Sequence, residues 1–186
     1  MRAARPHRLL RLAPAALLAG AALAACGLSS VARQASVHLS AARSGSGVLM
    51  RTDGTGSGAL RQVGDQLTVS TTVSGLAPGS RHAEVVHGPF GYCKPNLQVP
   101  DVAVILPDLV VGANGTAHAS LRTIVNTEVV EKGYYLTVLH GPTPTRERSL
   151  VGSAPTPAYT AAMASNVPML CGNLGPVSPA ATRRRG

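Results

Sequence analysis

The sequence predicts an all-β domain built as a sandwich or a barrel. Its clearest strand alternates apolar and polar residues from Leu67 to Val73, which is the period-two pattern of a half-buried strand. Turn signals recur between such segments at short intervals, as in sandwiches and barrels. No segment has the period of an amphipathic helix, and only Thr160–Met163 is expected to add one helical turn.

About eight short strands are expected in order along the chain. Besides the strand at Leu67, they are Val37–Leu39, Val48–Arg51, Gly58–Gln62, His82–His87, Val102–Leu106, Thr116–Arg122 and Tyr134–His140. Turns are expected at Asp53-Gly54, Pro78-Gly79, Asn114-Gly115 and Lys132-Gly133. Asn114-Gly115 lies between two apolar runs, which predicts a hairpin. The glycine-rich run Gly54–Gly58 opens no helix, so it is expected to be a hairpin loop rather than a phosphate cradle.

Two later segments are expected to contain little regular structure. Residues 141–170 are rich in Pro, Ser, Thr and Ala and form a long connection, which is either functional or poorly ordered. From Pro176 on, the chain is expected to be disordered, and residues 178–186 form a basic tail.

The first 26 residues have the pattern of an export signal. A basic start is followed by an apolar run from Leu12 to Ala25, which is shorter than the ~20 residues that span a bilayer. Leu23-Ala24-Ala25-Cys26 resembles a bacterial lipobox, which implies cleavage before Cys26 and lipidation of its sulfur. Residues 1–25 are therefore expected to be a signal peptide, and residues 26–35 a tether that joins a membrane lipid to an extracytoplasmic domain at residues 36–177. An ordinary signal peptide with a chance cysteine is the alternative.

The other two cysteines are expected to pair. With Cys26 carrying lipid, Cys93 and Cys171 form an even remainder, and an oxidising compartment favours one disulfide between them.

The charge of the chain indicates no nucleic-acid partner. Four of the 17 basic residues precede Cys26, so the chain from Cys26 on has 13 basic and 8 acidic residues and a net charge of +5. Three of these positive charges are Arg183, Arg184 and Arg185 in the tail, which we expect to be solvated. There is no basic stripe with interleaved aromatic residues, so nucleic-acid binding is not predicted.

Several segments are informative through their order along the chain: Gly75–Gly79, His82–His87, Cys93, Asp108–Ala117, Leu136–Gly141 and Met169–Gly175. Over residues 36–177, this order resembles that of the copper,zinc superoxide dismutase family. The resemblance implies an eight-stranded Greek-key β-sandwich of the flattened-barrel type, in agreement with the strand pattern.

The same resemblance implies a degenerate metal site. Two of the four copper ligands of the family match His87 and His140, a third position is Val85, and the bridging histidine has no counterpart. Two imidazoles are a poor ligand set for Cu(II), so at most weak copper binding is expected. Zinc is not expected, because its aspartate position falls on Ile105 rather than Asp108. The guiding arginine position is Pro168.

The sequence offers no clear replacement for the missing copper ligands. His38, His82 and His118 are expected to be surface histidines, and Met163 and Met169 to be packing residues rather than Cu(I) ligands.

We therefore expect an exported, lipid-anchored, dismutase-like protein with a binding or structural role in the envelope. Efficient dismutase activity is not expected, and no catalytic residue or protein partner is predicted. The alternative is an active copper-dependent superoxide dismutase with a rearranged site.

Overall fold

The computed structural model describes residues 31–44, 47–48, 51–89, 93, 102–163 and 166–179. Cys26, the predicted signal peptide and the end of the basic tail lie outside the described residues. The long strands are β1 (Arg33–Ala41), β4 (Thr55–Val63), β5 (Gln66–Ser74), β6 (Arg81–His87), β7 (Val102–Val110), β8 (Ala117–Ile124), β9 (Tyr135–Leu139) and β10 (Pro168–Asn173). Short strands are β2 (Arg43–Ser44), β3 (Gly47–Val48) and β11 (Ser178–Pro179).

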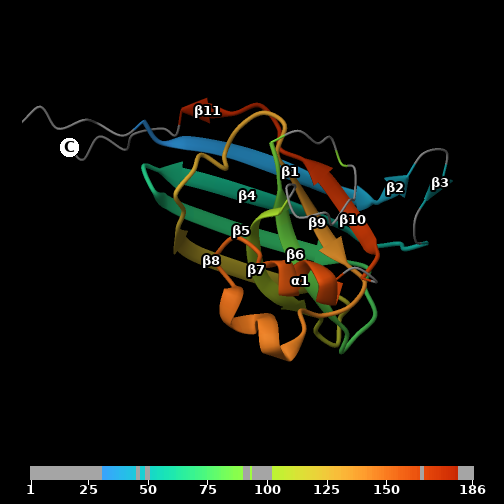
Figure 1. Ribbon diagram of the computed structural model, residues 1–186. Coiled ribbons are helices and arrows are strands. Elements are labelled where there is room, and N and C mark those ends of the chain that lie inside the picture. Colours follow the sequence, from blue (N-terminus) through green and yellow to red (C-terminus); the bar gives the residue numbers. More distant parts are fainter. Residues whose placement is uncertain are drawn as a thin grey trace, which may run out of the picture.

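The eight long strands form one antiparallel sheet that curls into a nearly closed, flattened barrel (Figure 1). Their order is β7-β6-β9-β10-β1-β4-β5-β8, and β11 pairs with the start of β1. Strands that are distant in sequence are neighbours, as in Greek-key connections: β5 pairs with β8, and β6 with β9. The predicted all-β sandwich-barrel class is confirmed.

Alternation of side chains builds the core inside the barrel. Odd-numbered residues of β5 point inward together with Val37 and Leu39 of β1, and the even-numbered residues of β5 face outward. On the opposite layer, Leu136 and Val138 of β9 close this core. The apolar pattern of the sequence therefore specified which face of each of these strands is buried.

The β6-β7-β9 side of the barrel is buried on its outer face as well. Two short helices, η2 (Thr145–Leu150) and α1 (Pro157–Met163), lie outside this layer (Figure 1). Tyr159 and Met163 of α1 pack in a second cluster with Ala83, Val85 and Ile105. The segment expected as a long connection is thus a cover that hides the outer face of β6. Among the described residues, no helix is long and apolar enough to cross a bilayer.

Several local predictions were wrong. Gly54–Gly58 is not a hairpin loop, because Thr55 already begins β4. Of the strand expected over Val48–Arg51, Val48 belongs to the two-residue strand β3, Arg51 is irregular, and residues 49 and 50 lie outside the described residues. Asn114-Gly115 does form a tight turn, with the Gly115 N–H donating to the Gly112 carbonyl at 3.0 Å. The strands on either side of it do not pair with each other, since β8 pairs with β5 instead.

The ordered domain also extends beyond the boundaries expected from the sequence. β1 begins at Arg33, inside the segment assigned to a tether. At the other end, Gln34 of β1 pairs with Ser178 of β11, so residues 178 and 179 are part of the sheet.

One buried glutamine closes the barrel end at which β1 begins. The Gln62 side-chain nitrogen donates to the carbonyls of Gly64 and Thr127, at 3.1 and 2.9 Å. Its oxygen accepts from the N–H groups of Val129 and Val130, at 2.9 and 3.3 Å. These bonds hold the segment ahead of β9 across the barrel end, where Val129 and Val130 are fully buried.

A carboxyl group is buried inside the barrel. Glu84 lies on β6 and points inward with Val86, and it is 1% exposed. Burial raises the pKa of Glu84 to about 8, although the Thr71 hydroxyl on β5 favours the ionised form. Within the described residues, Glu84 Oε1 has no hydrogen-bond partner. Glu84 is therefore protonated in the folded protein at neutral pH.

Glu84 makes stability depend on pH. Between pH 4.5 and about 8 the unfolded chain ionises this carboxyl while the folded protein does not. Glu84 therefore lowers the free energy of unfolding as the pH rises through that window, by ~1.4 kcal/mol per pH unit. We predict that Glu84→Gln, which cannot ionise, removes this loss. Urea unfolding from pH 4 to 9 measures it, and equal pH slopes for variant and parent would contradict the prediction.

Candidate functional site

The two histidines expected as copper ligands lie at opposite ends of one strand pair. β6 and β9 are antiparallel, with Glu84 opposite Val138 and His87 opposite Tyr135. His140 follows the last residue of β9, five residues along the chain from the residue opposite His87. At about 3.3 Å per residue, the two backbones are roughly 16 Å apart. The structure does not bring His87 and His140 together.

His87 is enclosed on the outer face of the barrel. Its ring is fully buried and is stacked on Tyr135, with ring centroids 4.6 Å apart and an angle of 5° between the planes. His87 Nε2 lies 2.8 Å from Thr137 Oγ1, and Nδ1 has no hydrogen-bond partner among the described residues. Burial lowers the pKa of His87 to about 3, so the ring is neutral.

The register explains which group accompanies His87. Thr137 and Val85 are directly opposite each other on β9 and β6, on the same face as His87. The side chain within reach of the His87 ring is therefore a threonine hydroxyl. The neighbouring positions for family ligands hold Val85 and Ile105, which are fully buried and have no donor atoms.

The residues present do not fit the copper and zinc centres that the resemblance implies. The two expected copper ligands, His87 and His140, are far apart, and one of the two nitrogens of His87 is engaged by Thr137. In the part of the chain that the structure describes, no group of three or more His, Cys, Asp or Glu side chains is arranged to hold a metal ion.

Asp108 has a structural role next to the helical cover. Its Oδ1 accepts a hydrogen bond from the Thr143 N–H at 3.0 Å, and its Oδ2 lies 3.6 Å from the Arg81 guanidinium. Burial, with a smaller contribution from the Asp108 charge, raises the pKa of Tyr159 to about 12. Asp108 thus anchors the start of the cover to β6 and β7.

The predicted disulfide is present. Cys93 and Cys171 are bonded, with their Cα atoms 5.6 Å apart and 78 residues between them in sequence. The bridge ties Cys93 to β10, where Cys171 packs beside Ala42 and Tyr135.

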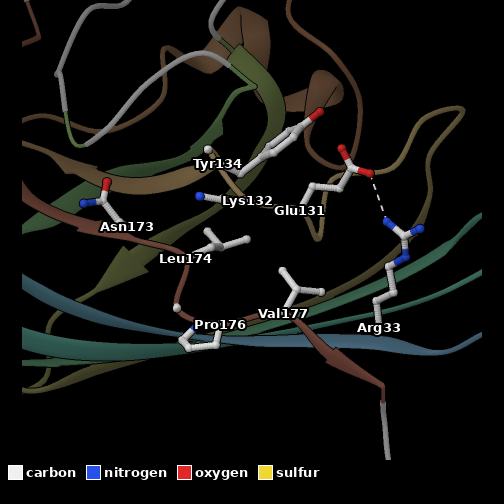
Figure 2. Close-up of a pocket in the computed structure, with 10 residues that line it drawn as sticks. Arg33, Glu131, Lys132, Tyr134, Asn173, Leu174, Pro176 and Val177 are labelled. Atoms are coloured by element: carbon white, nitrogen blue, oxygen red, sulfur yellow. Dashed lines mark hydrogen bonds and ion pairs between the residues drawn. The ribbon is translucent and has the colours of Figure 1, made fainter.

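An open groove of about 810 Å³ lies at the barrel end that Gln62 closes. Figure 2 shows Glu131, Lys132 and Tyr134 on one side and Leu174, Pro176 and Val177 on the other. Arg33 lies at the edge and pairs with Glu131 at 2.9 Å and with Glu128 at 2.5 Å. The Arg33 charge is therefore neutralised, and the groove is mainly apolar.

A second cleft, of about 540 Å³, lies at the opposite end of the barrel, where β1 ends and β4 begins. It contains His140, which is exposed, and His82, which is only 4% exposed. The prediction that His82 is a surface histidine was wrong, because its ring folds back onto the backbone of β9. Sequence reasoning also missed Arg51, which precedes β4 without any recognisable motif.

These features define a class: an eight-stranded, disulfide-bridged antiparallel barrel with a cleft at either end. A scan against protein-family models finds no match, and a search of curated proteins finds no similar sequence.

The burial of His87 predicts acid sensitivity. Between pH 6.5 and about 3 the unfolded chain protonates this imidazole while the folded protein does not. His87 therefore lowers the free energy of unfolding as the pH falls through that window, again by ~1.4 kcal/mol per unit. His87→Phe keeps a ring to stack on Tyr135 and should flatten this acid-side slope.

The same variant leaves the Thr137 hydroxyl without its partner, which should cost ~1–3 kcal/mol at pH 7. Urea midpoints from pH 3 to 7 test both effects. An unchanged acid slope would show that His87 is protonated in the fold.

Proposed function

We propose that this chain is an exported lipoprotein whose barrel has a binding or structural role at the cell envelope and does not turn over superoxide efficiently. In this proposal Cys26 carries the lipid, and the barrel is held at the outer surface of the membrane. Its resemblance to copper,zinc superoxide dismutases is one of barrel design, without the metal chemistry of that family.

The observation that carries the proposal is the buried environment of the His87 ring. A redox-cycling copper needs several fixed ligands and access for superoxide. Here the ring is buried, stacked on Tyr135 and bonded to Thr137, and His140 lies at the far end of the strand pair. The Cys93–Cys171 disulfide supports export, because such bridges persist in oxidising compartments.

The lipid anchor is tested by Cys26→Ser. Without the sulfur no thioether to lipid can form, so the protein should leave the membrane fraction or accumulate with its leader uncleaved. Fractionation of the expressing cells and intact-mass measurement detect either result, and Ser30→Ala serves as the control. A Cys26→Ser protein that stays in the membrane at the parent's mature mass would refute the anchor.

The chemistry is tested by loading the purified mature protein with copper and zinc and then dialysing it. We expect superoxide decay no faster than with metal-free protein, and the same result for His140→Ala. Metal content is measured on the same samples. One retained copper per chain with turnover near the diffusion limit, ~10⁸–10⁹ M⁻¹s⁻¹, would instead establish a dismutase with a rearranged site.

A further inference from the structure

The cleft that contains His82 and His140 is rich in positively charged and hydrogen-bond-donating groups. Arg51 supplies a permanent positive charge, and Thr52 supplies a hydroxyl. Among the described residues that line this cleft, none is acidic. The rest of its wall is apolar or glycine: Gly75, Leu76, Ala77, Gly141, Pro142 and Met169.

His82 lies at the back of this cleft and is fixed there by hydrogen bonds. Its Nδ1 lies 3.0 Å from the Leu139 carbonyl, which can only accept, so Nδ1 carries a proton. Its Nε2 lies 2.7 Å from Ser80 Oγ, and Ser80 Oγ donates to the Ala77 carbonyl at 2.6 Å. Both ring nitrogens of His82 are therefore engaged by oxygen atoms of the fold.

The nearest carboxyl along β6 does not cancel the charge of Arg51. Glu84 lies two residues from His82 on the same inward face of β6, deeper in the barrel. Since burial keeps Glu84 protonated, Glu84 places no negative charge behind the cleft. Asp108 is engaged with Arg81 and Thr143 on the outer face of the sheet.

The donor set does not suit a metal ion. A metal needs a free lone pair on each ligand, and both nitrogens of His82 are committed to oxygen partners. Only the ring of His140 and the thioether of Met169 would remain, and Met169 is 7% exposed. An anion, in contrast, uses the charges and donors as they stand.

We propose that this cleft binds a small organic oxyanion, a molecule with a carboxylate or phosphate group on a short apolar body. The anionic group would be held by Arg51 and His140 at the mouth. The apolar body would contact Leu76 and Met169. The volume of about 540 Å³ is that of a small-molecule site. This inference goes beyond the proposed function and holds whether or not Cys26 is lipidated.

The test is isothermal titration of the mature protein with butyl phosphate, butyrate and butylammonium at pH 6 and low salt. We expect saturable 1:1 binding of at least one of the two anions and none of butylammonium. The better anion distinguishes a phosphate from a carboxylate ligand. Arg51→Gln and His140→Gln should each weaken binding about tenfold, the usual effect of losing one charge-assisted hydrogen bond. Both side chains are exposed, so neither change should affect folding.

Arg122→Gln and His118→Gln provide matched controls. Both residues are exposed on β8 and do not line the cleft. They should leave the affinity unchanged. Failure of both anions to bind, equal binding of butylammonium, or an equal loss in the control variants would overturn the proposal. None of these results depends on dismutase activity or membrane attachment.

Discussion

The antiparallel register of β6 against β9 is the constraint on which the rest of the structure depends. It pairs Glu84 with Val138 and His87 with Tyr135. Because side chains alternate with a period of two, a shift by one residue would exchange the two faces of a strand. The carboxyl of Glu84 would then leave the core and Val85 would enter it. The same register places His87 and His140 at opposite ends of the β6-β9 strand pair, where their surroundings differ.

Two buried titratable groups on β6 act on stability in opposite directions. Glu84 weakens the fold as the pH rises above 4.5, and His87 weakens it as the pH falls below 6.5. Between these values their contributions have opposite slopes and cancel. The pair therefore gives a plateau of stability at mildly acid pH, with a decline on either side. Neither group alone would produce that plateau.

The fold class could be predicted from the sequence, because alternation is a local property. Leu67, Val69, Thr71 and Val73 mark one face of β5 without reference to any other strand. Pairing is not local, and it is where prediction failed. Asn114-Gly115 is a genuine turn, but it joins two strands at opposite edges of the sheet. Gly56 suggested a loop, whereas its lack of a side chain lets β4 approach β5, since a Cβ there would lie 2.6 Å from the Thr72 carbonyl.

The candidate site divides in the same way. Counting cysteines was enough to pair Cys93 with Cys171, since only one pair remained once Cys26 was set aside. The distance between His87 and His140 follows from the register of β6 against β9. That register cannot be read from the residues next to either histidine. The burial of His82 was also hidden, because it depends on the ring bending back to the Leu139 carbonyl on a neighbouring strand.

The position at which the chain enters the barrel has a further consequence. Val31 leads into β1 at the end that Gln62 closes, whereas the cleft of Arg51 lies where β1 ends. Nine-residue strands such as β1 and β4 separate the two ends by about 30 Å. An attachment through the residues before Val31 would place the barrel end with the groove of Arg33 and Glu131 nearer to the attachment point. The cleft would then open away from the attachment point and face the solution.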